Sequence, residues 1–381
     1  MRGSVLSIEK NLDETILSFI KEALDKKCID AVILPKRIPS GDSFAYLLIK
    51  DKSILEGASP FPPIIPVQGA KAISNLTRQG SVKKKILAIM HPCEIRATVE
   101  LFKLKQTTLN NIIFMSYDCP GVLPLSNYLE NPDENDQTFL AAQQKWDCED
   151  MRPVCKMCTE FIASTSDLYI GLLGTDEGKV FLIPNSPQGE ELLNAFGLNS
   201  DVPLDKWETE VEKLRKEREN NREEAQQELK TKVEGSENLL EVFSNCINCH
   251  NCMRVCPVCY CRQCYFDSDA FKFTPDNYIV KAEKKGSIRL PSDTLIFHLG
   301  RMSHMIHSCV SCGTCEDACP MDIPIAQIFN LVADKTQQVL DYKPGRNIGE
   351  PLPTVVYQEE ELQEFEKPYT ETYIKVEETN V

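Results

Sequence analysis

Two short cysteine runs with the same spacing constrain this chain more than any other feature. The first, CINCHNCMRVCP, spans residues 246–257, and the second, CVSCGTCEDACP, spans residues 309–320. Each follows the pattern C-x2-C-x2-C-x3-C-P, with which proteins hold iron–sulphur clusters. Three thiolates on one tight loop cap three irons of a [4Fe–4S] cubane, and the fourth thiolate, just before the proline, reaches a neighbouring cluster. The two loops are therefore expected to lie side by side.

This crossing pattern predicts which thiols share a cluster. Each cluster takes three cysteines from one run and the last cysteine of the other run. The two predicted ligand sets are Cys246, Cys249, Cys252 and Cys319, and Cys309, Cys312, Cys315 and Cys256. We expect a bacterial-type ferredoxin-like α+β domain with two clusters over residues 237–332. Paired zinc sites explain the runs less well, because no closed quartet of zinc ligands is spaced here.

Composition limits the setting in which such a chain works. Most of the 17 cysteines stand at ligand spacing, so disulfides explain them poorly. The N-terminal residues MRGSVLSIEKN lack the apolar core of a signal peptide, and no apolar run is long enough to be a transmembrane segment. A cytoplasmic location is expected. The net charge of −15 and the absence of a dense basic patch make nucleic acid an unexpected partner.

The N-terminal half predicts a mixed α/β domain over residues 1–204. Its expected elements are a helix over 8–27, strands over 31–34 (ended by Pro35), 44–49 and 86–90, a helix over 94–105, and strands over 112–117, 168–172 and 179–183. The unbroken apolar runs at 86–90 and 112–117, separated by one helix, predict a parallel strand–helix–strand unit.

Two cysteines follow the strands of this unit. Cys93 comes after the first strand and Cys119 after the second, so both should lie beyond the carboxyl edge of the sheet, where open α/β sheets bind ligands. Cys155 and Cys158 form a further C-x2-C downstream. These four thiols are the predicted ligands of a third [4Fe–4S] cluster. A buried apolar role is the alternative for either strand-end cysteine alone, and Cys148 is an alternative fourth ligand.

Several features outside the clusters leave alternatives open. The charged segment 205–236 predicts a long exposed helix with a thin apolar stripe, either a linker or a surface for a partner. The tail 333–381 is acidic and interrupted by prolines, and we expect it to wrap a neighbour or to be mobile. Two residue groups remain undecided. The first is a thiol triplet that either binds metal with a partner's ligand or packs. The second is three histidines that we expect on a helix surface or at an interface, although two of them, three residues apart, could share a face as metal ligands do. The two groups are Cys259, Cys261 and Cys264, and His298, His304 and His307.

Three stretches resemble the beta-subunit family of coenzyme F420-reducing hydrogenases and F420-dependent formate dehydrogenases. They are HPCEIRATVELFKLKQ at 91–106, DCPG at 118–121 and CKMCTEFIASTSDLYIGLLG at 155–174. The similarity covers roughly residues 60–200 together with the ferredoxin runs. This chain departs from the family in two ways. Its ferredoxin module follows the flavin domain rather than preceding it, and HPCE stands where many members have a Thr-Pro-Cys-Gln loop.

The resemblance implies an iron–sulphur flavoprotein that is an oxidoreductase subunit. Such a subunit binds FAD beside a [4Fe–4S] cluster and passes electrons between an F420-like hydride carrier and a redox partner of the hydrogenase, formate dehydrogenase or heterodisulfide reductase type. The crevice cysteines become the flavin-proximal ligands. The residues expected to bind the flavin are His91, Pro92, Glu94, Arg96, Asp118 and Gly121. No catalytic residue is predicted.

Two alternatives accompany this interpretation. The alternative for the whole chain is a flavin-free electron-transfer adapter in a complex like heterodisulfide reductase. In that case a partner subunit determines which reaction is catalysed. Arg96 either helps to hold the flavin's diphosphate or its reduced ring, or is a surface residue paired with Glu100 one helical turn away.

The first testable prediction concerns iron. Anaerobically purified and fully reconstituted protein should contain about 12 iron atoms per chain, because three cubanes carry four irons each. Iron and acid-labile sulphide assays measure this directly. A content of about eight would remove the third cluster and leave the two in the ferredoxin runs.

Overall fold

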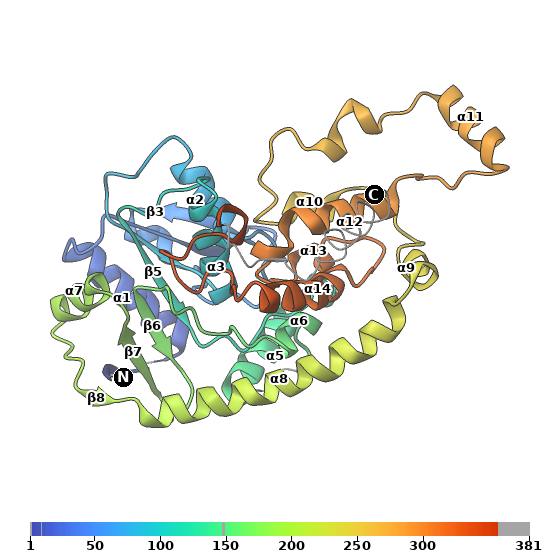
Figure 1. The fold of residues 1–381 in the computed structure, drawn as a ribbon. Helices are drawn as coiled ribbons and strands as arrows, with labels where there is room; N and C mark the ends of the chain where they lie inside the picture. The colour runs from blue at the N-terminus through green and yellow to red at the C-terminus, as the bar shows by residue number, and fades with distance from the viewer. Residues whose placement is uncertain (1, 9, 147–148, 357–381) are drawn as a thin grey trace, which may run out of the picture. The chain divides into compact units, whose positions relative to one another are not determined.

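The protein is described by a computed structural model that covers residues 2–8, 10–146 and 149–356. The chain divides into two compact units, Met1–Ile348 and Gly349–Val381. Within the described part of the second unit is a short 3-10 turn, Pro353–Val355. All the predicted site residues belong to the first unit, which Figure 1 shows as a sheet with helices followed by a largely helical region.

An eight-stranded sheet forms the N-terminal part, in the order β3-β2-β4-β5-β6-β7-β1-β8. Adjacent strands of the central group β2, β4, β5 and β6 are parallel. The flanking pairs β2–β3, β6–β7, β1–β7 and β1–β8 are antiparallel. In chain order, the strands are β1 (Arg2–Ser7), β2 (Ala31–Arg37), β3 (Phe44–Ile49), β4 (Ile86–Ile89), β5 (Ile112–Tyr117), β6 (Leu168–Gly171), β7 (Lys179–Pro184) and β8 (Val202–Pro203).

Helices cover both faces of the sheet, which explains why its central strands are apolar without interruption. In β4, Leu87 and Ile89 face one core with α1 and α7, while Ile86 and Ala88 face another with α2 and α3. The helices of this part are α1 (Leu12–Asp25), α2 (Gly69–Thr77), α3 (Pro92–Lys103), α4 (Leu125–Glu130), α5 (Pro132–Lys145), α6 (Pro153–Lys156) and α7 (Pro187–Ala195). The parallel pairing of β4 and β5 around α3 confirms the predicted strand–helix–strand unit.

Two details of the predicted elements were wrong. β2 does not end at Pro35. On one side, β4 pairs with β2 only as far as Ile33, so the missing N–H of Pro35 removes no hydrogen bond between these two strands. The helix expected over 8–27 begins only at Leu12, since residues 2–7 form β1, which the sequence did not predict.

The region that carries the two cysteine runs is built from helices and loops. Its helices are α9 (Ser236–Val242), α10 (Asn251–Val255), α11 (Pro275–Lys285), α12 (Thr294–Met305), α13 (Thr314–Asp317) and α14 (Ile325–Val339). No strand lies within residues 237–332, so the α+β class expected for this domain is not found. The core of this region is formed by helices and loops alone. In it, Phe243, Phe297 and Phe329 pack with cysteine and methionine side chains.

Helix α8 (Asp205–Val233) runs from the sheet to the helical region, as Figure 1 shows in yellow-green. Its bounds confirm the predicted long helix. Its buried residues, however, face its own chain rather than a partner: Trp207, Val211 and Leu214 pack with the sheet core. Farther along, Arg222 donates to the Met157 carbonyl at 3.1 Å and pairs with Asp334 at 3.0 Å.

The expected start of the tail at residue 333 falls inside α14, which continues to Val339 because Ile328, Phe329 and Ala333 bury one helical face. The chain beyond α14 also packs on its own first unit. Tyr342 donates to Glu100 at 2.6 Å, and the Gly345 N–H donates to the same carboxylate at 2.9 Å. Residues 334–348 are therefore part of the fold, whereas the domain boundaries at 204 and 236 stay predictions.

The anchoring of α8 generates the second prediction. Changing Trp207 to Phe removes the indole N–H that donates to the buried Asp118 carboxylate at 2.9 Å. The free energy of unfolding should fall by about 2–3 kcal/mol, because a hydrogen bond to a charged group is lost at a buried site. Urea unfolding followed by circular dichroism measures the change.

The same substitution at Trp146, which is only partly buried in this core, is the matched control and should cost less. Equal losses at both positions would mean that the Asp118 contact does not anchor the helix.

Candidate iron–sulphur and cofactor site

Four cysteines gather at the carboxyl edge of the parallel strands. Cys93 lies in the first turn of α3, directly after β4, and Cys119 follows β5. Cys155 lies on α6 and Cys158 just beyond it. All four line one pocket. The structure thus brings together the quartet expected from the sequence, and its role as a cluster site stays a proposal.

Burial governs the protonation of two of these thiols, Cys93 and Cys155. Burial raises the pKa of Cys93 strongly, and the nearby Cys312 and Glu94 add to the shift. Burial raises the pKa of Cys155 to about 11, although Arg152 opposes the shift. Without metal, Cys93 and Cys155 hold their protons at neutral pH. Loading a cluster must therefore release protons, since only thiolates ligate iron.

Two predicted residues shape the pocket through their backbone. Pro92 opens α3, where its fixed φ suits the first helical position. Gly121 has a φ of +126°, and a side-chain carbon there would approach the Cβ of Cys155 to 3.0 Å. Both line the pocket. Gly121 is needed because the loop after β5 passes so close to α6.

The second cysteine run forms a pocket of its own. Its wall contains Cys256 from the first run together with Cys309, Cys312 and Cys315 from the second. This is the crossed arrangement that the spacing predicts. Cys312 also lines the crevice pocket, so the two sites share a wall.

The remaining quartet also converges. Burial raises the pKa of Cys252 to about 11, Arg301 opposes the shift, and the neighbouring thiols of Cys246, Cys249 and Cys319 add to it. These four cysteines, which come from both runs, are therefore close neighbours. Within this group Cys249 is exposed, whereas Cys252 is buried.

His298 departs from the surface role expected for it. It is completely buried on α12, stacks on Phe243 with ring centroids 4.1 Å apart, and lies 3.4 Å from the Cys246 sulphur through Nε2. Burial lowers its pKa to about 3, and the charges of Arg301 and His250 act in the same direction. A neutral His298 therefore faces a predicted cluster ligand. His304, in contrast, is exposed as expected.

The donor sets suit a cluster better than one ion. Among the described residues, no three His, Cys, Asp or Glu side chains are arranged to hold a single metal ion. A cubane is larger, and each of its irons takes its own thiolate. Arg301 gives a second sign: it lines the pocket of the Cys309 quartet, and within the described residues its three guanidinium nitrogens have no polar partner apart from the Cys259 thiol. A buried, unpaired cation fits an anionic thiolate-bound cluster.

Three of the residues expected to hold the flavin are instead engaged by the chain itself. Glu94 accepts from the Tyr46 hydroxyl at 2.6 Å, the Gly69 N–H at 2.6 Å and the His91 N–H at 2.9 Å. Although burial works to raise the pKa of Glu94, the hydrogen bond and charge of His91 outweigh it and lower the pKa. Glu94 is thus a buried carboxylate that positions its surrounding loops.

Asp118 likewise has a structural role. Its carboxylate accepts from the Tyr169 hydroxyl at 2.8 Å, from the indole of Trp207, and from the N–H groups of Leu172 and Leu173 at 2.7 and 2.9 Å. Burial raises its pKa despite these donors. Both oxygens thus have donors from the chain itself, and the expected contact of Asp118 with a flavin stays a prediction.

Arg96 is not the surface residue paired with Glu100 that one of its two predicted roles required, and its contact with a flavin stays a prediction. It is buried, and its guanidinium donates to the Pro344 carbonyl at 2.9 Å and to the Val310 carbonyl at 3.4 Å. Glu100 binds Tyr342 and Gly345 instead of Arg96. Arg96 therefore joins α3 to the second cysteine run and to the segment after α14, contacts between residues too far apart in sequence to be predicted from spacing.

Polar atoms without partners mark the corner beside the crevice. His91 is buried and lines both the crevice pocket and an adjacent space. Its Nδ1 contacts Glu94 at 3.0 Å, while its Nε2 lacks a partner among the described residues. The buried side-chain amide of Gln68, which directly precedes α2, is likewise unpaired within the described part of the chain. These polar atoms are therefore available to a ligand.

Sequence reasoning missed Gln68 and two buried arginines, of which Arg218 lines the crevice and Arg152 does not. The sequence feature that could have identified Gln68 is its position, as a single polar residue between a proline-rich segment and the start of a helix. Arg218 lines the crevice from α8 and donates to the Pro120 carbonyl at 2.8 Å. Arg152 is buried, ion-pairs with Asp317 and donates to the Cys312 carbonyl at 3.0 Å. Neither arginine stands out in a chain with many charged residues.

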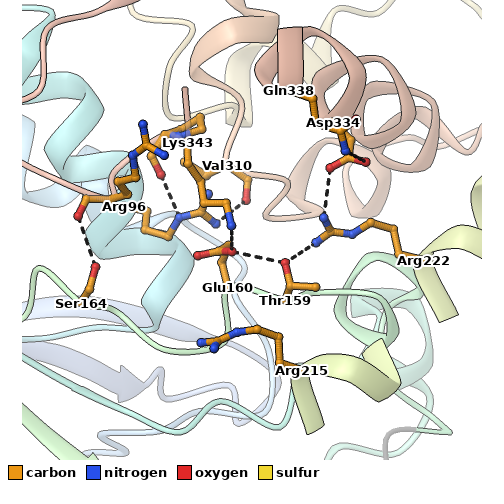
Figure 2. Close-up of polar contacts among 12 residues, drawn as sticks. Arg96, Thr159, Glu160, Ser164, Arg215, Arg222, Val310, Asp334, Gln338 and Lys343 are labelled. Atoms are coloured by element: carbon orange, nitrogen blue, oxygen red, sulfur yellow. Dashed lines mark hydrogen bonds and ion pairs between the residues drawn. The ribbon is translucent and has the colours of Figure 1, made fainter. Parts of the chain in front are cut away.

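A polar network fixes the segment that follows Cys158. Figure 2 shows Glu160 and Thr159 between Lys343 on one side and Arg222 on the other. Burial works to raise the pKa of Glu160, but the charges of Arg96 and Lys343 outweigh it and lower the pKa to about 2. The segment after C-x2-C is thus tied to α8 and to the chain beyond α14.

The thiol triplet gathers around a separate pocket. Cys259 lies 3.4 Å from the Met305 sulphur and Cys264 lies 3.5 Å from the Met253 sulphur, while Cys261 is exposed. All three cysteines line this pocket. These contacts favour the packing role for Cys259 and Cys264. Cys148, the alternative crevice ligand, lies outside the described residues.

Comparisons with known proteins agree with this site. The C-terminal family of coenzyme F420 hydrogenase/dehydrogenase beta subunits matches residues 128–209, and the 4Fe-4S dicluster domain matches residues 242–323. The F420-dependent formate dehydrogenase subunit beta of Methanocaldococcus jannaschii is 28% identical over 362 residues, covering 87% of this chain and 91% of the relative. The F420-dependent formate dehydrogenase 1 subunit beta of Methanococcus maripaludis is 29% identical over 366 residues, covering 87% and 90%.

Among solved structures, a chain of the F420-reducing [NiFe] hydrogenase complex from Methanosarcina barkeri matches with a TM-score of 0.44 and 15% identity, covering 59% of this chain and 91% of that chain. The sequence matches define the chain as an oxidoreductase subunit with a [4Fe–4S] dicluster domain. More particularly, it resembles the beta subunits of coenzyme F420 hydrogenases and F420-dependent formate dehydrogenases, which confirms the resemblance found in its sequence. Within the described residues, no helix has the length and apolar character needed to cross a membrane.

The crevice quartet generates the third prediction. Changing Cys155 to Ser should abolish the third cluster and lower the iron content by about four atoms per chain, because one of its four ligands is lost. The EPR signals of the two clusters in the dicluster domain should persist. Iron assay and EPR of the dithionite-reduced protein measure both effects.

Changing Cys28 to Ser is the matched control, because Cys28 packs against the sheet core outside every quartet. Loss of a dicluster signal in the Cys155 variant would show that the ligand grouping is wrong.

Proposed function

We propose that this chain is a flavin-binding beta-type subunit that carries electrons between a hydride carrier and a partner redox subunit through three [4Fe–4S] clusters. The observation that carries the proposal is the position of Cys312. This residue lines both the crevice pocket and the pocket of the Cys309 quartet. Two sites that share a wall are close enough to form successive steps of one electron path.

The order of the path follows from the burial of its parts. The crevice quartet lies at the strand ends, beside the corner of unpartnered polar atoms. The Cys309 quartet comes next, through Cys312. The last quartet contains the exposed Cys249, which makes this end the exit toward a partner.

When bound, FAD supplies the conversion of a two-electron hydride into single electrons. The chain's contribution is to hold it and exclude water. His91 and Gln68 are the residues that would hold the ring, because their buried polar atoms lack partners among the described residues. Glu94 fixes the His91 ring through Nδ1 and leaves Nε2 toward the crevice. Pro92 and Gly121 shape the adjoining wall.

The relatives' names suggest the substrate and the partner. Both formate dehydrogenase relatives are F420-dependent beta subunits. We propose F420 as the hydride carrier and a hydrogenase, formate dehydrogenase or heterodisulfide reductase type of subunit as the partner. We further propose a cytoplasmic location, since all 16 cysteines among the described residues are free thiols.

One observation favours the flavin-free adapter as a second candidate. Three of the six residues expected to bind flavin form hydrogen bonds within the chain itself. They are Glu94, Arg96 and Asp118. In an adapter, the crevice would hold only its cluster, and a partner would carry out the hydride chemistry.

The fourth prediction separates the two candidates. Flavin-loaded protein should be bleached by reduced F420 and should pass electrons to a one-electron dye. Changing Cys119 to Ala should abolish dye reduction but leave flavin bleaching largely intact, because the variant lacks the cluster next to the flavin. Anaerobic stopped-flow absorbance follows both reactions.

Changing the exposed Cys261 to Ala is the control and should leave both reactions unchanged. If reduced F420, NADH and NADPH all fail to bleach the flavin-loaded protein, or if the protein retains no flavin, the adapter takes the place of the hydride-transfer function.

A further inference from the structure

Arg301 is a buried cation that forms no ion pair with a carboxylate of the described residues. It lies on α12 with 2% of its surface exposed, and within the described part of the chain its Nε, Nη1 and Nη2 atoms have no polar partner apart from the neighbouring Cys259 thiol. Its guanidinium lies 4.5 Å from the centre of the Phe329 ring. A cation–π contact offsets only part of the cost of taking a guanidinium out of water. Something else must balance this charge.

Arg152 shows how this chain treats another buried arginine. It is equally buried, at 2%, but it forms an ion pair with Asp317 and donates to the carbonyls of Cys312 and Ile65. Its charge is compensated by the protein. The unpaired guanidinium of Arg301 is therefore specific to its position in the dicluster region and not common to the buried arginines of this chain.

That place lies between the two quartets of the dicluster region. Arg301 lines the pocket formed by Cys256, Cys309, Cys312 and Cys315. The same helix, α12, also carries His298, three residues before Arg301, and the His298 Nε2 lies 3.4 Å from the Cys246 sulphur of the other quartet. Arg301 therefore stands on the helix that contacts both quartets.

We propose that Arg301 is a positioning residue that sets the reduction potentials of both clusters in the dicluster region. Reduction adds one electron to a cluster that already carries the negative charge of four thiolates, and the electron comes from the crevice cluster or from the partner subunit. A fixed positive charge nearby stabilises the reduced form more than the oxidised form, since Coulomb energy grows with the charge and is weakly screened in the interior. The inference rests on the ligand grouping of the proposed function.

The test is an EPR-monitored redox titration of the full-length, anaerobically reconstituted protein. Arg301→Gln removes the charge, Arg301→Met removes it while keeping an apolar chain against Phe329, and Arg301→Lys keeps it. The matched control is Arg254→Gln. Arg254 lines a pocket with Arg301 but is 65% exposed, so water screens its charge.

We expect the Gln and Met variants to lower the equilibrium constant for reduction of both clusters about tenfold, which for one electron is a shift of about 59 mV to more negative potential. The Lys variant and the Arg254 control should stay close to wild type. The inference is overturned if the Gln and Met variants keep wild-type potentials, if Lys shifts as far as Gln, or if Arg254→Gln shifts equally.

Two further outcomes are distinguishable from these. If all three Arg301 variants fail to retain the clusters, Arg301 is required for assembly and does not set potentials, which also overturns the inference. A failure of the ligand grouping appears already in the wild-type protein, as missing iron or a missing EPR signal, before any variant is compared.

Discussion

The arrangement of this protein depends on one buried arginine that joins its two halves. Arg152 precedes α6 in the sheet-bearing half, yet it donates to the carbonyl of Cys312 and pairs with Asp317 in the second cysteine run. Its other nitrogen reaches the Ile65 carbonyl, in the proline-rich segment beside the crevice. Together with the donation of Arg96 to the Val310 carbonyl, this join holds residue 312 against thiols 93, 119, 155 and 158. The proposed electron path therefore requires a contact that has no sequence signature.

Local sequence patterns were sufficient to predict much of the fold. Unbroken apolar runs identified β4 and β5, and the helix between them required a parallel crossover, which the register confirms. The same logic placed Cys93 and Cys119 at one edge of the sheet. Fixed cysteine spacing predicted that Cys256 would join the second run, and the structure brings it there. In each case the information lay within a few residues or in a strict period.

Several predicted site residues have polar partners that lie far away in the sequence. Asp118, Glu94 and Arg96 were predicted to line the pocket because they follow the ends of strands. Each also bonds donors or acceptors 25 to 248 residues away, in addition to its near neighbours. His298 was predicted to lie on a helix surface, but it is buried against Cys246. Charge and spacing identify residues capable of binding, but only the tertiary contacts decide which of them still have capacity for a ligand.

The bare guanidinium of Arg301 also bears on how such a protein is made. Before its clusters arrive, the polypeptide holds an uncompensated buried cation amid protonated thiols, and this state is costly to pack. Closing the helical region thus depends on the same inorganic groups that later carry electrons. Cofactor delivery then acts as a checkpoint of biosynthesis: chains that miss their iron and sulphide remain loosely folded and are open to proteolysis, so the pool of mature protein follows the cell's supply of clusters.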